Sequence, residues 1–208
     1  MQGGYRFLSL SRPFDLLIFG GSQGASIFNR VVPQAIAMLS VEERRRLRVT
    51  HQAQKNDMTT LLQAYNAADV YAEIRDFFTD MPRRIRRAHL VISRAGASTV
   101  SELSAIGAPS ILVPLPGSLD ADQLHNTRDL VGHGGAWVMQ QKAFVPARLA
   151  AYLSQLMANP DKLRVAAQAA RSCGTHDAVA KLGRYVLCLA NRQPVEIEAH
   201  ASASRIAQ

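Results

Sequence analysis

The sequence has only two cysteines and no long apolar run. Cys173 and Cys188 cannot build a disulfide framework, and no metal-ligand spacing surrounds them, which is typical of a reducing compartment. The opening stretch MQGGYRFLSLSRPFD lacks the apolar core of a signal peptide. Apolar runs elsewhere are also too short to span a bilayer. We therefore expect a globular, soluble chain that binds no metal and is not exported.

Aromatic residues make up only 6% of the chain, and none interleaves with the arginine clusters RRRLR (44–48) and RRIRR (83–87). A groove for single-stranded nucleic acid would stack bases on such aromatics. No RNA- or DNA-binding motif is present either, so we expect no nucleic-acid partner. The net charge of +8 still favours an anionic partner, such as anionic lipid or a phosphorylated substrate. A solvated helix face or turn is the alternative interpretation of the two clusters.

Short apolar runs alternate with longer helical patterns along most of the 208 residues. Several runs are continuously apolar, as in strands buried on both faces of a parallel sheet. Their alternation with helices predicts βαβ units and a doubly wound parallel α/β sheet. The expected strands are 16–20, 47–51, 70–77, 89–94, 110–115 and 136–140, and the expected helices are 24–39, 56–67, 81–87, 99–106, 123–132, 146–157, 161–170 and 177–191.

The stretch LLIFGGSQGA (16–25) allows two kinds of chemistry at Ser22. It fits G-x-S-x-G, the turn that exposes a nucleophilic serine in α/β-hydrolases, and Asp120 and His125 follow in the hydrolase order. Only one strand precedes Ser22, however, so no earlier loop can supply the oxyanion donor. The stretch also predicts a strand, a glycine turn and a helix N-terminus, where Ser22 would donate to a phosphate oxygen. An N-cap role for Ser22 is the structural alternative.

A second strand, glycine turn and helix follow in ISRAGASTVSELSAIGAP (92–109). Glu102 lies early in this helix, where a carboxylate accepts both hydroxyls of a ribose in dinucleotide folds. Thr99 and Glu102 also fit a capping box, in which Glu102 bonds back to the N-cap amide. Spacing alone favours the box.

Amide side chains follow the next strand, in LVPLPGSLDADQLHN (112–126). Loops at the carboxyl ends of strands line the ligand crevice in open α/β sheets. Gln123 and Asn126 would there offer amides to sugar hydroxyls. The alternative is helix-start chemistry by Asp120 and Asp122.

Taken together, the motifs GGSQGA, FFTDM, SRAGASTVSELSAIG and DADQLHN, in this order and spacing, resemble the C-terminal half of the MurG family over residues 14–157. That family transfers N-acetylglucosamine from UDP-N-acetylglucosamine to lipid I and so forms lipid II in peptidoglycan synthesis. The resemblance implies a Rossmann-like sheet that is one half of a GT-B glycosyltransferase, an inverting enzyme that needs no metal or other cofactor.

The resemblance also assigns roles to residues. Ser22 matches a serine on the donor diphosphate, Phe78 a residue whose backbone pairs with the uracil edge, and Gln123 a glutamine that reads the sugar. Residues 97–102 match the turn under the diphosphate, with Glu102 on the ribose, whereas Asp122 stands where many relatives have glutamine. The expected donor-binding residues are Ser22, Gln23, Phe78, Ala97, Ser98, Thr99, Val100, Ser101, Glu102, Gln123 and Asn126.

Other family parts are missing from this sequence. The family's N-terminal glycine-rich loop with its histidine, and an arginine in the linker between its domains, would precede this chain. We therefore expect a donor-binding domain over 1–192, a disordered tail over 193–208, no catalytic residue in this chain, and no activity without the acceptor domain. The resemblance further implies lipid I as the acceptor and a peripheral location on the anionic cytoplasmic face of the bacterial inner membrane. Another UDP-sugar transferase, such as a glycolipid synthase, and a non-catalytic nucleotide-binding module are the alternatives.

Overall fold

Six strands form one parallel sheet in the residues that the computed structural model describes, 13–20, 26–117 and 122–174. Their order is β3-β2-β1-β4-β5-β6, so the chain adds strands on one side of β1 and then crosses to the other side. This confirms the predicted doubly wound α/β sheet. The expected helix 177–191 and the expected tail lie outside the described residues. The strands are β1 Phe14–Phe19, β2 Leu47–Gln52, β3 Tyr71–Arg75, β4 Leu90–Ser93, β5 Ser110–Leu112 and β6 Ala136–Val138.

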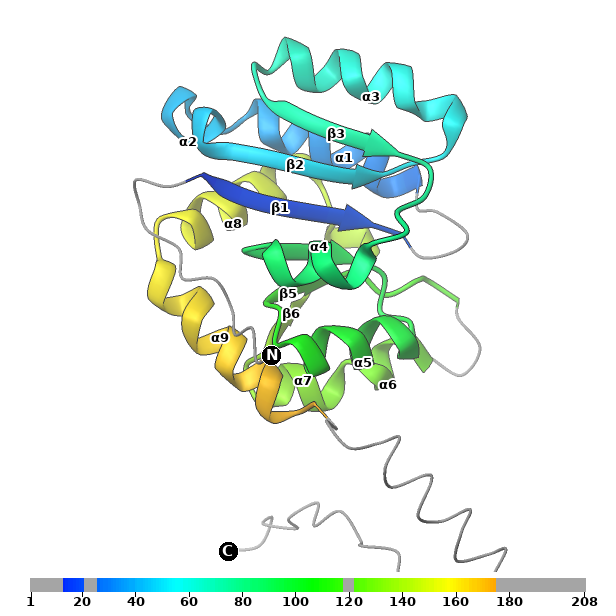
Figure 1. Cartoon of the computed structure of the whole chain (residues 1–208), viewed down its shortest axis with the longest axis vertical. Helices are drawn as coiled ribbons and strands as arrows, with labels where there is room; N and C mark the ends of the chain where they lie inside the picture. Colours follow the sequence, from blue (N-terminus) through cyan, green and yellow to red (C-terminus); the bar gives the residue numbers. More distant parts are fainter. Residues whose placement is uncertain (1–12, 21–25, 118–121, 175–208) are drawn as a thin grey trace, which may run out of the picture. The chain divides into compact units, whose positions relative to one another are not determined.

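Helices cover both faces of this sheet (Figure 1). On one face, α1, α3 and α8 bury the side chains of alternate strand residues such as Leu16, Ile18 and Ile92. On the other face, α4, α5 and α7 pack on the intervening residues, including Leu17 and Val91. The helices are α1 Ser26–Ala37, α2 Val41–Arg46, α3 Lys55–Ala67, α4 Met81–Arg87, α5 Ala97–Ile106, α6 Asp122–Asn126, α7 Arg128–Gly132, α8 Pro146–Met157 and α9 Pro160–Ser172, with a 3₁₀ turn, η2, at Gln141–Ala143.

The described helices cover the second face only partly. In Figure 1, α4 lies in front of the strands beside β1, whereas β2 and β3 carry no described helix on that side. Because side chains alternate along a strand, Arg48 and Thr50 of β2 share this face with Tyr71 and Glu73 of β3, their register partners. These polar side chains account for the half-buried pattern of both strands.

Helices α1, α3, α5 and α9 begin or end one or two residues from the predicted bounds, and two larger differences have a local cause. The expected helix 123–132 is two short helices, because Thr127 turns the chain between them and its hydroxyl donates to the Leu124 carbonyl at 2.7 Å. Helix α2 was not predicted. It buries no residue and is held by a capping box, in which the Ser40 hydroxyl accepts from the Glu43 amide and the Glu43 carboxylate accepts from the Ser40 amide.

Candidate functional site

The two glycine turns of the sequence follow neighbouring strands. β1 and β4 pair in parallel, with Ile18 beside Ile92 and Phe19 beside Ser93. The segments that follow β1 and β4 therefore leave the sheet at the same edge, at the point where the strand order reverses. Ligands of open α/β sheets bind at this point. Ser22 and Gln23, in the turn after β1, lie outside the described residues.

Helix α5 presents an open N-terminus at this edge. Its N-cap is Gly96, with φ −64° and ψ 149°, and no side chain caps the helix. Its first turn contains no acidic residue. The N–H groups at Ala97, Ser98 and Thr99 are therefore available to an anion, and the positive end of the helix dipole favours one. The alternative of a capping box at Thr99 and Glu102 is wrong, because the helix has already begun two residues before Thr99.

The solvent side of α5 carries a set of polar side chains. Ser98, Ser101 and Glu102 are exposed, whereas Val100 is buried against the sheet. Residues three and four apart are neighbours on a helix surface, so these three side chains lie together. Glu102 is the sixth residue of the helix, roughly 7–8 Å along the axis from Ala97 at 1.5 Å per residue. No described residue hydrogen-bonds its carboxylate. The face therefore offers amide donors at one end and a carboxylate acceptor farther along.

Gln123 and Asn126 lie at the same edge and are each half engaged. The Leu115 amide donates to Gln123 Oε1 at 2.9 Å, which ties α6 to the loop after β5. Asn126 Nδ2 donates to the Ala95 carbonyl at 3.2 Å, in the turn before α5. Within the described part of the chain, Gln123 keeps its NH₂ group and Asn126 keeps its Oδ1 for a ligand. Toward a ligand at this edge, Gln123 would therefore donate and Asn126 would accept.

Phe78 is buried in the loop between β3 and α4, with only 4% of its surface exposed. The Arg84 guanidinium lies over its ring, 4.1 Å from the centroid. Arg84 is itself fixed by Glu73, whose carboxylate accepts from both terminal nitrogens at 2.6 and 3.0 Å, and by Asp80 at 2.7 Å. Hydrogen bonding to Arg84 lowers the pKa of Glu73 and of Asp80. The backbone that carries Phe78 is therefore held in place by an ion-pair network.

Arg94 was not predicted as part of the site. It follows β4 directly and donates to the Val113 and Pro114 carbonyls after β5 at 3.1 and 3.3 Å. Its other terminal nitrogen donates to Gln141 Oε1 at 2.8 Å. Burial lowers the pKa of the guanidinium. Arg94 thus ties together the carboxyl ends of two adjacent strands beside the turn into α5.

The histidines do not assemble a hydrolase site in the described residues. His51 is fully buried in β2, where its Nδ1 lies 2.8 Å from the Tyr65 hydroxyl, and burial lowers its pKa to about 3. His125 is exposed on α6. Asp120, the third residue of the hydrolase alternative, lies outside the described residues, as Ser22 does.

Neither a metal site nor a membrane-spanning helix is found within residues 13–20, 26–117 and 122–174. Among those residues, no group of three His, Cys, Asp or Glu side chains could hold a metal ion. No helix among them has the length and apolar character that a bilayer crossing requires.

Comparisons with known proteins agree on one family. Residues 15–182 match the model of the glycosyltransferase family 28 C-terminal domain. The UDP-N-acetylglucosamine--N-acetylmuramyl-(pentapeptide) pyrophosphoryl-undecaprenol N-acetylglucosamine transferase of Rhodospirillum rubrum is 48% identical over 184 residues, which are 88% of this chain and 48% of that protein. The protein of the same name from Methylobacterium radiotolerans is 50% identical over 178 residues, 85% of this chain and 48% of that protein. The chain spans about half the length of the curated relatives it matches.

Solved structures agree with the fold. The crystal structure of Acinetobacter baumannii MurG matches with a TM-score of 0.78 and 30% identity, covering 91% of this chain and 55% of that one. The UDP-GlcNAc 2-epimerase of Neisseria meningitidis, bound to UDP-GlcNAc, matches with a TM-score of 0.60 over 85% of this chain and 44% of that one. Its identity of 11% shows the fold alone. The sheet is accordingly the Rossmann-like half of a GT-B architecture.

Proposed function

The chain belongs to the family of the glycosyltransferase family 28 C-terminal domain, and from this premise we propose that it is the donor-binding half of a lipid II-forming transferase. The complete enzyme would move N-acetylglucosamine from UDP-N-acetylglucosamine to lipid I, in the synthesis of peptidoglycan. The names of the relatives, and their identity of 48–50%, support this assignment.

The observation that carries the proposal is the uncapped N-terminus of α5 beside the switch point of the sheet. A diphosphate placed there would accept from the N–H groups of Ala97, Ser98 and Thr99. Negative charge grows on the departing UDP during transfer, and donors already aimed at that charge stabilise it without reorganising. In this proposal Ser22 adds a hydroxyl donor from the turn after β1, with Gln23 beside it. No metal is needed for this charge stabilisation.

The uridine and sugar would extend to either side of the diphosphate. Glu102 would accept from the ribose hydroxyls, and the backbone at Phe78 would pair with the uracil edge. On the sugar side, the NH₂ of Gln123, which no described residue engages, would donate to a hydroxyl, and Asn126 Oδ1 would accept from one. This division of roles follows from the hydrogen bonds that already occupy the other atom of each amide.

The acceptor half of the enzyme would complete the reaction. Lipid I is lipid-linked, so we infer a peripheral enzyme on the anionic cytoplasmic face of the bacterial inner membrane, and the net charge of +8 supports attraction to such a surface.

Calorimetry with UDP, UMP and uridine tests the donor assignment. We expect UDP to bind more tightly than UMP, and UMP more tightly than uridine, because the helix N-terminus acts on the phosphates. UDP-N-acetylglucosamine and UDP-glucose, titrated in parallel, separate the proposed donor from other UDP-sugars. Equal affinities for uridine and UDP would refute the phosphate site, and a preference for UDP-glucose would favour a different transferase.

A further inference from the structure

The loop between β3 and α4, residues 76–80, presents backbone groups that the fold does not use. It carries Phe78, whose side chain is buried beneath Arg84. Neither the N–H nor the C=O of Phe78 forms a hydrogen bond with another described residue. These two groups therefore do not hold the loop, and contacts made by its other residues must fix the direction in which they point.

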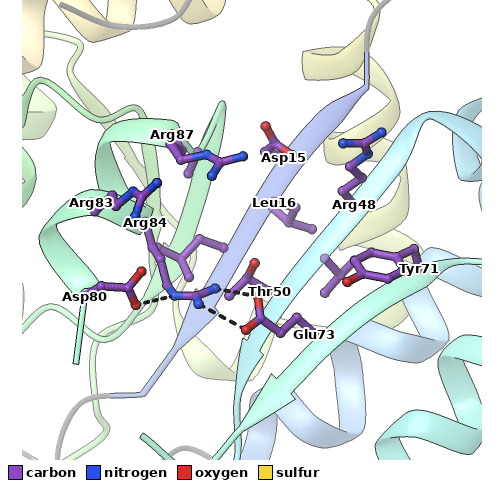
Figure 2. Close-up of a pocket in the computed structure, with 13 residues that line it drawn as sticks. Asp15, Leu16, Arg48, Thr50, Tyr71, Glu73, Asp80, Arg83, Arg84 and Arg87 are labelled. Carbon is purple, nitrogen blue, oxygen red and sulfur yellow. Dashed lines mark hydrogen bonds and ion pairs between the residues drawn. The ribbon is translucent and has the colours of Figure 1, made fainter. Parts of the chain in front are cut away.

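One anchor lies on the α4 side of the loop. Figure 2 shows Arg84 of α4 between Glu73 of β3 and Asp80, with hydrogen bonds to both carboxylates. Asp80 is the N-cap residue of α4, so this bond joins the end of the loop to the helix. The same guanidinium lies over the Phe78 ring. This anchor therefore holds the Phe78 side chain and the residues that follow it.

Gln52 holds the other end of the loop. It is the last residue of β2 and the register partner of Arg75, the last residue of β3. The Ala53 amide donates to the Arg75 carbonyl at 3.0 Å and extends the pairing by one residue. The chain then bends at Asp76, and the Gln52 side-chain NH₂ donates to the Asp76 carbonyl at 3.1 Å. A side chain thus anchors the first residue beyond the strand.

The other contacts of Asp76 are weak. Lys55 Nζ lies 3.5 Å from Asp76 Oδ2, but these side chains are 81% and 48% exposed, and exposed ion pairs contribute little. No second donor to the Asp76 carbonyl is found among the described residues. Since β3 is an edge strand of the described sheet, no described strand supports the loop from its outer side. The carbonyl is therefore held chiefly by Gln52.

We propose that Gln52 is a positioning residue for the nucleobase, because its bond to Asp76 fixes the backbone that Phe78 offers to the base edge. This role rests on the proposed donor function, in which the base is uracil. Only Phe77, which is 68% exposed, separates the two anchored residues. The backbone on either side of Phe77 is therefore set by the Gln52 bond before it and by the buried ring of Phe78 after it.

A backbone held in this way at Phe78 distinguishes uracil from cytosine. Uracil presents an acceptor at O4 beside a donor at N3, whereas cytosine presents a donor at N4 beside an acceptor at N3. The N–H and C=O of one residue can pair with the uracil edge and would meet like groups on cytosine, which leaves them unpaired. Release of the loop removes an advantage of UDP and creates none for CDP. Loss of the Gln52 bond should therefore reduce the preference for UDP over CDP.

Calorimetric titrations with UDP and CDP test the proposal in Gln52→Met, which removes the NH₂ donor and keeps a side chain of similar length. We expect UDP affinity to fall by about three- to tenfold, the effect of one hydrogen bond, and CDP affinity to change by less than about twofold. The matched control is Gln63→Met, at an exposed position of α3 whose side chain bonds no described residue. It should change neither affinity.

Amide ¹⁵N relaxation without ligand tests the anchor itself. The amides of Phe77 and Phe78 should become more mobile in Gln52→Met and stay unchanged in Gln63→Met, and unaltered mobility in Gln52→Met would overturn the proposal. An unaltered ratio of UDP to CDP affinity in Gln52→Met would also overturn it, and UDP binding by the unchanged chain would then leave the donor function standing. If the unchanged chain does not bind UDP, the donor function fails and the positioning role fails with it.

Discussion

The substitution Glu102→Ala separates binding from folding at the proposed ribose position. Glu102 is exposed, has no described partner and does not cap α5, so its loss removes no observed intramolecular hydrogen bond. We expect the free energy of unfolding to change by less than about 0.5 kcal/mol, as for surface substitutions. Loss of a charge-assisted hydrogen bond to the ribose should cost about 1.5–3 kcal/mol of binding free energy. That cost corresponds to roughly 10- to 150-fold weaker UDP binding.

The assay is a pair of measurements on one protein preparation, namely UDP calorimetry and urea unfolding. Glu42→Ala is the matched control, because Glu42 is an exposed glutamate on α2, which leads into the amino end of β2, whereas α5 begins at the carboxyl ends of the strands. It should leave UDP affinity unchanged. Unaltered UDP affinity in Glu102→Ala would refute the ribose contact. A lowered unfolding free energy with unaltered affinity would show that the carboxylate supports the helix instead.

Three further predictions concern His51, Arg94 and the activity of the chain alone. Because burial lowers the pKa of His51 to about 3, the unfolded chain alone takes up this proton as the pH falls below 6.5, so stability should decrease on acidification, by about 2 kcal/mol at pH 5. Urea unfolding at several pH values across this range should show that the free energy of unfolding of His51→Leu depends less steeply on pH than that of the unchanged protein. An equally steep pH dependence would contradict the assignment to His51. Arg94→Met should cost about 2 kcal/mol of stability, measured in the same way against Arg164→Met, because it removes donors to the Val113 carbonyl and Gln141; equal losses in the two variants would argue against the tie. The chain alone should form no lipid II from labelled UDP-N-acetylglucosamine, since holding donor and acceptor in near-attack geometry is worth about 7–11 kcal/mol; product made without a separately expressed N-terminal half would place the acceptor site in this chain.

The sequence was most informative where a local signal marks the end of an element. Helices α4 and α8 begin and end at the predicted residues, and each has a proline in its first turn, where the missing N–H costs nothing. The strand order could not be read from periodicity in the same way. The βαβ pattern and the resemblance predicted a doubly wound parallel sheet and no particular strand order, and the observed register shows that β1 and β4 are neighbours.

The same four-residue pattern forms a capping box at one place in the chain and forms none at another. Ser40 and Glu43 form a capping box that starts α2, although that helix was missed because it has no apolar stripe. Thr99 and Glu102 fit the same pattern and form no box, since Gly96 already serves as N-cap. A local pattern does not say which of several small residues begins the helix. The outcome here depends on where β4 ends and how the turn after it packs.

Contacts between distant segments explain what the sequence could not supply. Arg94 meets Gln141, 47 residues away, and no local spacing signals that bond. The net charge of +8 favoured an anionic partner without locating it. At the carboxyl ends of the strands, the uncapped N-terminus of α5 would offer backbone N–H groups to the proposed diphosphate, and the net charge counts no such groups.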